Sequence, residues 1–415
     1  MTKTMLYQLL LFTSLFLGAC EKSDPITPDN QEIEQDTIFE LVWATRINFN
    51  KEIIGTDNTQ EYNDWILVGG DIDDPPTIMA FNKDTGEKDW ELILDEVPGK
   101  EIDFMVKLDH LLIARNAYSM FAIDLETRNL LWYKNLHAIG IRLGRMTLAE
   151  NNKVYLKADF GFGTSLQILH IFEFDPLTGE NRVVFSKSPD NTGIYSCSPP
   201  AIWNDPESGK ELLIFNLYPD SYAPPEKGAQ FLIGVDPSTK EELWSIPIVD
   251  QFGSGGGHAP VIVNNIAITG GWDKIFSIDL ISKKISWETK FDYPWAVWSN
   301  TQRLVVNDKI YANTSQEDVA CLDLETGNFI WTNPKGGPNC TDNMLYYEKE
   351  DLLVFTSWGY GSVMILDAIT GETIHREHRY DNSSFNNDIV YDEERDMFFT
   401  STHKHAIGFK VRRPR

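Results

Sequence analysis

The feature of this chain that most constrains its fold is a short phrase that recurs along most of its length. Each copy has an apolar strand ending in Asp or Asn, a tight turn that often carries Thr-Gly, and usually a Trp a few residues later. The Asp or Asn of the copies falls at positions 82, 124, 175, 236, 279, 323 and 367. A period of about 40–50 residues containing only short strands is typical of radial repeats, in which each copy forms one blade of a β-propeller.

The strands inside one period can be read from alternation and turn chemistry. In the fifth copy we expect strands over 260–263, 266–270, 274–279 and 285–290, with a turn at Asn264-Asn265. In the sixth copy we expect strands over 304–306, 309–313, 318–323 and 329–331, with a turn at Asn307-Asp308. In each copy the Asp or Asn opens the hairpin between strands three and four, and Gly closes it with a positive φ. The Trp is expected to pack against the adjacent blade, so these repeated residues are interpreted as structural.

The two ends of the chain together supply an eighth blade. Seven phrases precede it, and an eighth third strand, 405–411, runs almost to the C-terminus with no fourth strand after it. A segment with the fourth-strand pattern, 39–46 with Trp43, stands at the N-terminal side with no blade before it. We therefore predict an all-β fold: an eight-bladed β-propeller of four-stranded antiparallel blades over 38–411. The N-terminal strand is expected to close it, so that no open edge remains.

The repeated phrase resembles the pyrroloquinoline-quinone-like (quinoprotein-type) repeat family over roughly residues 38–411. Two copies depart from the pattern: the third has Val183 or Val184 at the Trp position, and the fourth has Lys240 in place of Gly. The quinone-dependent dehydrogenases that share these repeats typically carry two adjacent cysteines beside the cofactor, and no two cysteines are adjacent here. We therefore expect no cofactor, and specifically no pyrroloquinoline quinone with Ca²⁺. Non-catalytic members are closer in size, notably the eight-bladed propeller lipoprotein of the outer-membrane β-barrel assembly machinery.

The N-terminus has the pattern of a bacterial lipoprotein signal peptide. Lys3 gives a basic start, residues 5–17 are apolar, and Leu17-Gly18-Ala19-Cys20 is a lipobox. The apolar run is shorter than the about 20 residues that a membrane span needs. We therefore expect residues 1–19 to be removed and Cys20 to become the lipidated first residue, with several acyl chains such as palmitate to hold it on a membrane.

The segment after the lipobox suggests where the protein resides. Residues 20–37 are polar and contain Pro, so a flexible tether is expected there, and 412–415 form a short C-terminal tail. Glu21 does not look like an inner-membrane retention signal, so we predict a lipid anchor in the outer membrane of a Gram-negative envelope. Both the periplasmic and the surface-facing leaflet remain open.

Charge and motif content exclude several functions. The net charge of −26 argues against nucleic acid as a partner, because a phosphate backbone requires a cationic footprint. No H-E-x-x-H, G-x-S-x-G or P-loop motif occurs, and no catalytic residue or metal site is predicted. With Cys20 acylated, three cysteines remain, and a disulfide between Cys321 and Cys340 is one open alternative for them.

The connections between the predicted strands differ on the two faces of the ring. The turns from strand one to two and from three to four are tight, whereas the long connections all lie on the other face, here called the loop face. Variable loops on a rigid scaffold commonly carry binding. Aromatic residues outside the repeat fall in these long connections: Trp272, Trp295, Trp298, Trp358, Tyr195, Tyr222, Tyr293 and Tyr360. We predict a binding surface made by Trp272, Trp295, Trp298, Trp358, Tyr360, Tyr222 and His258. The alternative is that the rings cap the core beneath the loops.

Two functions of different class are compatible with this pattern. The first is a non-catalytic binding or scaffolding module that docks an envelope protein or a glycan on the loop face, because aromatic rings stack on both. The second is a quinone-dependent or other oxidoreductase that uses the central channel. The lack of catalytic motifs favours the first.

Overall fold

The computed structural model of the chain describes most of the residues from Ile38 to Arg413, and the architecture given below concerns these residues. The described ranges are 38–47, 59–70, 75–99, 102–117, 119–136, 141–149, 152–161, 167–190, 193–219, 230–249, 258–271, 273–292, 303–314, 318–337, 340–357, 360–378, 385 and 387–413. Within them, the one helical element is the short 3₁₀ turn η3 (Glu348–Glu350).

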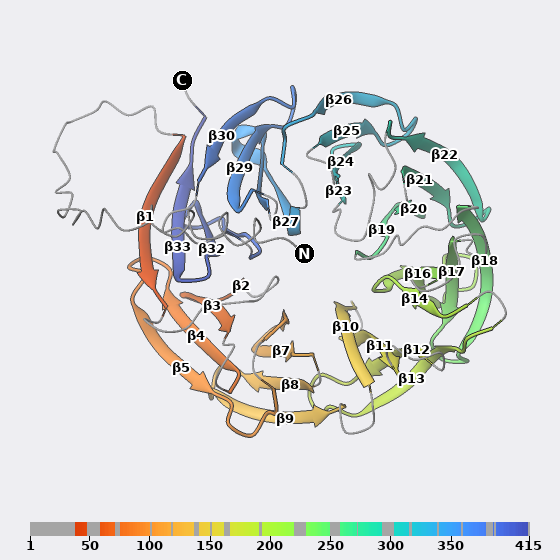
Figure 1. Ribbon diagram of the computed structural model, residues 1–415, viewed down its shortest axis with the longest axis horizontal. Helices are drawn as coiled ribbons and strands as arrows, with labels where there is room; N and C mark the ends of the chain where they lie inside the picture. The colour runs from red at the N-terminus through yellow and green to blue at the C-terminus, as the bar shows by residue number, and fades with distance from the viewer. Residues whose placement is uncertain are drawn as a thin grey trace, which may run out of the picture. The chain divides into compact units, whose positions relative to one another are not determined.

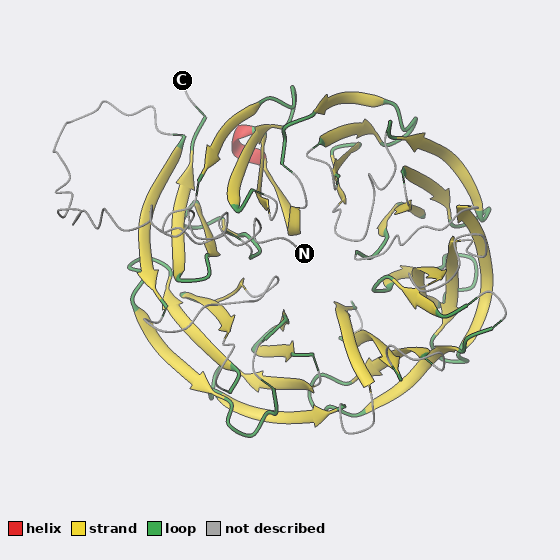
Figure 2. Ribbon diagram, in the orientation of Figure 1, coloured by secondary structure: helices red, strands yellow, loops and turns green. Residues whose placement is uncertain are grey.

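Eight antiparallel sheets stand side by side in a ring, and each of them is one blade (Figure 1; Figure 2). Blade 1 contains β2 (Thr59–Tyr62), β3 (Trp65–Gly70), β4 (Thr77–Asn82) and β5 (Lys88–Ile93). Blade 2 contains β6 (Phe104–Leu108), β7 (Leu111–Arg115), β8 (Ser119–Asp124) and β9 (Asn129–Asn135). Blade 3 contains β10 (Ile141–Leu148), β11 (Val154–Phe160), β12 (Ile168–Phe174) and β13 (Asn181–Lys187). Blade 4 contains β14 (Tyr195–Cys197), β15 (Ala201–Asn204), β16 (Glu211–Pro219), β17 (Gln230–Asp236) and β18 (Glu241–Val249).

The second half of the ring repeats the same order from the centre outward. Blade 5 contains β19 (Val261–Val263), β20 (Ile266–Gly271), β21 (Lys274–Asp279) and β22 (Lys284–Lys290). Blade 6 contains β23 (Arg303–Val306), β24 (Lys309–Asn313), β25 (Val319–Asp323) and β26 (Phe329–Asn333). Blade 7 contains β27 (Cys340–Tyr347), β28 (Leu352–Ser357), β29 (Ser362–Asp367) and β30 (Thr373–Glu377). Blade 8 contains β31 (Val390–Asp392), β32 (Met397–Ser401), β33 (His405–Val411) and β1 (Phe39–Arg46).

The strand that completes blade 8 comes from the N-terminal side, as the sequence predicts. β1 pairs antiparallel with β33, from Phe39 opposite Val411 to Arg46 opposite His405. This pairing covers the outer edge of β33, which would otherwise present unpaired backbone groups. The predicted eight-bladed propeller of four-stranded blades is confirmed, and so is the N-terminal strand that closes it.

Charged side chains join the same two blades. Lys83 of blade 1 donates from Nζ to Oδ2 of Asp392 in blade 8 at 2.7 Å, and both side chains are buried. Arg395 of blade 8 pairs with Asp64 at 2.6 Å and with Asp84 at 2.8 Å, both in blade 1. The seam between the first and last blades is therefore held by ion pairs in addition to the shared sheet.

Blade 4 departs from the common pattern because its inner strand is divided. Both β14 and β15 pair with β16, and between them lie Pro199 and Pro200. Proline has no N–H to give to a sheet and has a fixed φ, so two consecutive prolines interrupt the strand.

The hydrophobic core lies between neighbouring blades. Leu67 and Ala80 of blade 1, for example, cluster with Leu112 and Phe121 of blade 2. Middle strands are covered on both faces, and β7 is accordingly buried along its whole length. The outer strand β9 alternates between exposed and half-buried residues, because it lies at the rim of the ring. The near-continuous apolar runs of the middle strands and the alternation of the outer ones follow from this arrangement.

The repeated Trp and Gly form one contact between two blades. Trp287 at the end of blade 5 donates from Nε1 to the carbonyl oxygen of Leu324 in the turn of blade 6, at 3.1 Å. Gly327 closes that turn with a φ of 72°, and a Cβ atom there would lie 2.5 Å from the Trp287 ring. The Gly is therefore required both by the positive φ and by the neighbouring indole. Three further seams have the same contact, between Trp43 and Gly86, Trp132 and Gly179, and Trp331 and Gly371.

The contact is missing where the turn lacks Gly. Arg128 and Lys283 occupy the Gly position with positive φ in blades 2 and 5. The Trp residues of the preceding blades, Trp90 and Trp244, have buried Nε1 atoms that make no hydrogen bond. Each repeat Trp that faces a Gly turn thus donates a hydrogen bond across the seam, and the two that face Arg or Lys do not.

The predicted strand limits agree closely with the structure. The third strand of blade 5, 274–279, and the second strand of blade 6, 309–313, are confirmed residue for residue. The other strands expected in these two blades differ by two residues or fewer at each end. Both predicted turns are present, with positive φ at Asn264, Asn265, Asn307 and Asp308.

Candidate binding site

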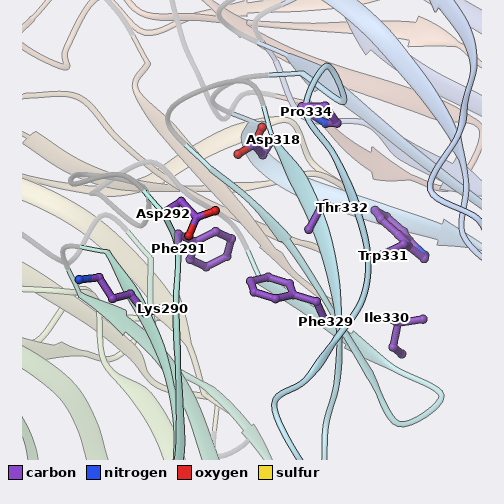
Figure 3. A pocket seen from close by; sticks show the side chains of 9 residues that line it. All are labelled: Lys290, Phe291, Asp292, Asp318, Phe329, Ile330, Trp331, Thr332 and Pro334. Atoms are coloured by element: carbon purple, nitrogen blue, oxygen red, sulfur yellow. The ribbon is translucent and has the colours of Figure 1, made fainter.

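A cavity of about 480 Å³ opens between the outer strands of blades 5 and 6 (Figure 3). Its wall on the blade 5 side is formed by the end of β22 and the residues that follow it, and its other wall by β26 and the residue before β25. The lining residues are Lys290, Phe291, Asp292, Asp318, Phe329, Ile330, Trp331, Thr332 and Pro334. The ends of β22 and β26 and the residue before β25 all lead to long connections, so the cavity reaches the loop face, and from there it extends along β26 to Phe329 at the start of that strand.

Aromatic rings form the apolar part of the cavity. Phe291 is buried in the core between blades 5 and 6, and Phe329 is 42% exposed. The two rings meet edge to face, with centroids 5.4 Å apart and an interplanar angle of 78°. A buried ring that supports an exposed one gives a rigid apolar surface on which another apolar group can pack.

The rim of the cavity carries charge of both signs. Asp292 and Asp318 contribute carboxylates, and Figure 3 shows both above the two phenyl rings. Lys290 is largely exposed, and its Nζ lies 3.4 Å from the carboxylate of Asp273. The arrangement, with an aromatic floor and acidic groups at the edge, suits a ligand that combines apolar and cationic parts.

Trp331 is half-buried in the cavity wall and has a structural partner. Its Nε1 donates to the carbonyl oxygen of Ala368 in blade 7 at 3.2 Å, in the Trp–Gly contact described above. Asn333, two residues later, donates from Nδ2 to the carbonyl oxygen of Gly371 at 2.7 Å. The strand that lines the cavity is thus fixed on its far side to the next blade.

Most of the side chains predicted for the binding surface lie outside the described residues. These are the aromatic residues Trp272, Trp295, Trp298, Trp358 and Tyr222. The predicted lipidation site, Cys20, also lies outside the described residues. Tyr293 is also outside them. Asp292, which lines the cavity, directly precedes in the sequence the segment that carries Trp295 and Trp298.

Two aromatic residues of the long connections, Tyr360 and Tyr195, are among the described residues, and they differ in burial. Tyr360 is half-buried, and the Arg376 guanidinium lies over its ring at 3.7 Å from the centroid, in a cation–π contact. Tyr195 is buried between blades 3 and 4, and its hydroxyl donates to Asp190 at 2.9 Å. Tyr195 lies in one of the long connections but is not one of the residues predicted for the binding surface, and its ring is part of the core.

His258 lies before the inner strand of blade 5 and meets a side chain from blade 3. Arg145 Nη1 is 3.4 Å from His258 Nδ1. Burial, and then the guanidinium groups of Arg145 and Arg303, hold the pKa of His258 well below its ordinary value. The imidazole is therefore neutral, and since arginine can only donate, Nδ1 accepts and Nε2 carries the proton.

The two cysteines whose side chains the structure describes are buried. Cys197 and Cys321 are free thiols, so a Cys321–Cys340 disulfide does not form. Burial raises the pKa of each thiol to about 12. Both are therefore protonated near neutral pH, which makes them poor nucleophiles.

Two further observations concern the residues that the structure describes. They contain no group of three or more His, Cys, Asp or Glu side chains placed to hold a metal ion. They also contain no helix with the length and apolar character to cross a membrane.

The sequence-based reasoning missed part of each site. Phe291 and Phe329 lie in or beside ordinary outer strands of blades 5 and 6. Their rings meet only because these two blades pack against each other. Arg145 follows Gly144 on an inner strand, and no sequence signal distinguished it. In both cases the residues come from different blades, whose contacts a repeat pattern does not specify.

The structure is thus an eight-bladed propeller with a cavity between the outer strands of blades 5 and 6, and comparisons with known proteins show what it is similar to. Residues 294–377 match the family model described as outer membrane protein assembly factor BamB. A search among curated protein sequences gave no match. The family match and the propeller fold together support the pyrroloquinoline-quinone-like propeller family that the repeats predicted.

Solved structures of several kinds share the fold. BamB from Moraxella catarrhalis is 12% identical, with a TM-score of 0.58 over 91% of this chain and 98% of that chain. A europium-containing methanol dehydrogenase is 10% identical, with a TM-score of 0.66 over 90% of this chain and 93% of that chain. The computationally designed protein Ika8 is 11% identical, with a TM-score of 0.61 over 90% of this chain and 100% of that chain. At these identities the likeness concerns the fold alone.

Proposed function

We propose that this chain is a non-catalytic binding module that takes an extended segment of a protein partner at the loop-face cavity between blades 5 and 6. The observation that carries the proposal is the cavity itself, with the Phe291–Phe329 pair as floor and Asp292 and Asp318 at its rim. The match of residues 294–377 to the BamB family model includes blade 6 and supports a scaffolding role.

The strand next to the cavity favours a polypeptide. β26 is the last strand of its sheet, so one side of its backbone is free of sheet partners. An extended peptide can hydrogen-bond to such an edge and place alternate side chains into an adjacent pocket. The segment we propose presents an apolar side chain to Phe329 and a Lys or Arg to the carboxylates, which also suits a chain of net charge −26.

We further propose that the module works at a membrane surface. The lipobox ending at Cys20 supports lipidation there, and residues 20–37 would tether the propeller to the outer membrane. The name of the matching family, an outer membrane protein assembly factor, supports the same location. Labelling with a radioactive fatty acid tests this: the full chain is expected to be labelled and the Cys20→Ser variant is not. Label on the variant would contradict the proposal.

The binding site is tested by a cross-link and a matched pair of variants. A photoreactive amino acid replaces Ile330, which is 47% exposed in the cavity wall, and the cross-linked partner and its segment are identified by mass spectrometry. A peptide of that segment is then titrated against the wild type, Phe329→Ala and Tyr133→Ala. Phe329 and Tyr133 are both aromatic, both 42% exposed and both on outer strands, but only Phe329 lines the cavity.

The variants separate binding from general surface effects. Loss of an aromatic anchor at an interface commonly costs about 2 kcal/mol or more, so Phe329→Ala should raise Kd about thirtyfold. Tyr133→Ala should leave Kd unchanged. Equal effects of the two variants, or cross-links only to a glycan, would overturn the proposed peptide site.

An oxidoreductase that uses the central channel is the second candidate, favoured by the partly buried Arg145–His258 contact and by the shared fold of a methanol dehydrogenase. We propose that the chain nevertheless works without pyrroloquinoline quinone, because no two of its cysteines are adjacent. Cys197 and Cys321 lie in blades 4 and 6. Adding the quinone and Ca²⁺ should give no dye-linked alcohol oxidation, and turnover would reverse the order of the two candidates.

A further inference from the structure

Arg303 is a buried cation that lacks a counter-ion among the described residues. It begins β23, the inner strand of blade 6, and is 8% exposed. No described carboxylate pairs with its guanidinium, and its Nε atom makes no hydrogen bond. Burial lowers the pKa of Arg303 to about 10, as expected of a cation removed from water without compensation.

A second buried arginine of the same chain is paired with a carboxylate, as buried cations usually are. Arg115, at the end of β7, is also 8% exposed, and its Nη1 donates to the carboxylate of Asp103 at 2.8 Å. Buried charges are normally paired, because desolvation costs several kcal/mol per ion when they are not. The chain has 62 acidic residues, yet none of those that the structure describes pairs with Arg303, which points to a binding place for an external anion.

Two further donors come to the same place from other blades. His258, just before β19, lies close enough to Arg303 for the guanidinium to affect its titration, and its Nδ1 is 3.4 Å from Arg145. The neutral imidazole presents its Nε2–H as a donor. Arg145 lies on β10 and Arg303 begins β23, while His258 comes shortly before β19, and these three strands are the inner strands of blades 3, 6 and 5 (Figure 1).

A distortion of the inner strand of blade 3 places Arg145 there. β10 has one extra residue relative to β11 between Leu143 and Met146, which is a β-bulge. Bulges redirect side chains and recur at binding sites. Gly144 permits it, since a Cβ atom at that position would approach the Lys157 side chain at 3.0 Å and its carbonyl oxygen at 3.2 Å.

We propose that Arg145, His258 and Arg303 bind a small oxyanion, a carboxylate or a phosphate, on the inner side of the ring. Guanidinium groups match the planar carboxylate and the phosphate with paired N–H donors, and such charge-assisted hydrogen bonds are the stronger ones. The site is separate from the cavity between the outer strands, and its occupancy does not depend on the peptide site proposed above.

Calorimetric titration of the full, detergent-solubilised chain with citrate and with inorganic phosphate tests the site, each against NaCl of equal ionic strength. One or both oxyanions should bind and raise the melting temperature, because a ligand that binds only the folded state stabilises it. Arg303→Met should raise Kd at least about tenfold, since it removes one charge-assisted pair. Lys88→Met, at an exposed position on β5, should bind like the wild type.

Stability without added anion distinguishes a binding arginine from a structural one. Arg303→Met removes a buried charge that has no partner among the described residues, so it should leave the melting temperature unchanged or raise it. Arg115→Met leaves Asp103 without its partner and should lower it. Failure of both oxyanions to bind, equal binding by Arg303→Met, or a melting temperature lowered as much as in Arg115→Met would overturn the proposal.

Discussion

Replacing Gly327 by Ala tests whether the Trp–Gly contact holds neighbouring blades together. Gly327 has a φ of 72°, and a Cβ atom there would lie 2.5 Å from Cδ2 and Cε3 of Trp287. The left-handed backbone costs a non-glycine residue about 1–2 kcal/mol, and forcing a methyl group into a packed contact costs about 1–3 kcal/mol more. Gly327→Ala should therefore reduce the free energy of unfolding by about 2–5 kcal/mol.

Gly209 provides the matched control for this substitution. It has nearly the same backbone, with a φ of 67°, but nothing lies within 4 Å of the Cβ position. Gly209→Ala should therefore cost only the backbone part, about 1–2 kcal/mol. Urea unfolding followed by circular dichroism measures both variants. In a Trp287→Ala background the cost of Gly327→Ala should fall toward that of Gly209→Ala, since the indole is gone and only Thr289 Oγ1, 2.8 Å from the Cβ position, remains close. Equal costs for the two glycine variants in the wild-type background would refute the proposed role of the contact.

Three further predictions follow from the seams between blades. Deleting residues 38–47 removes β1 and exposes the edge of β33, so the melting temperature should fall or the protein aggregate, and an unchanged melting temperature would exclude this mode of closure. Trp287→Phe should cost about 1 kcal/mol more than Trp90→Phe in unfolding experiments, because only Trp287 donates a hydrogen bond from Nε1, and equal costs would contradict this. Burial would raise the pKa of Asp392, but hydrogen bonds from Lys83 and the Arg395 backbone outweigh it, so that pKa lies below its ordinary value. The stability from Asp392 is thus present above about pH 4 and lost as the pH falls below it, and Asp392→Asn should flatten the acid side of the stability profile.

The repeat was enough to predict the ring because each of its signals is local. An Asp or Asn at the start of a hairpin accepts hydrogen bonds from the next turn residues, as Asp323 Oδ1 does from the Thr326 N–H at 2.8 Å. Gly at the end of the turn has the positive φ that the sequence predicts, as Gly327 does with a φ of 72°. Because the turn chemistry fixes where strands three and four begin and end, strand limits in blades 5 and 6 could be predicted to within two residues.

The candidate sites could not be predicted in the same way, because they depend on contacts between blades. The phenyl ring of Phe329 meets that of Phe291 across a seam, and Arg145 reaches His258 past the whole of blade 4. The spacing of the repeats along the chain predicts neither of these contacts between blades. The β-bulge at Gly144 adds one residue to β10, and the alternation of apolar and polar residues in the sequence does not reveal such an insertion. Sequence reasoning did select His258, but as a loop-face contact rather than as the neutral partner of an arginine.

The position of the cavity relative to the Trp–Gly contacts bears on how it would bind. Trp287 docks blade 5 onto blade 6, and Trp331 docks blade 6 onto blade 7, so the cavity lies where two docked seams follow each other. Blades 1 and 4 instead end in Trp residues with unpaired Nε1 atoms. A site whose walls are held on both sides loses little side-chain and backbone freedom when a partner binds. Of the four Trp–Gly contacts, two are consecutive, and they stiffen the seams on the two sides of blade 6. The cavity lies at the first of these two seams, where a rigid wall can hold a partner segment.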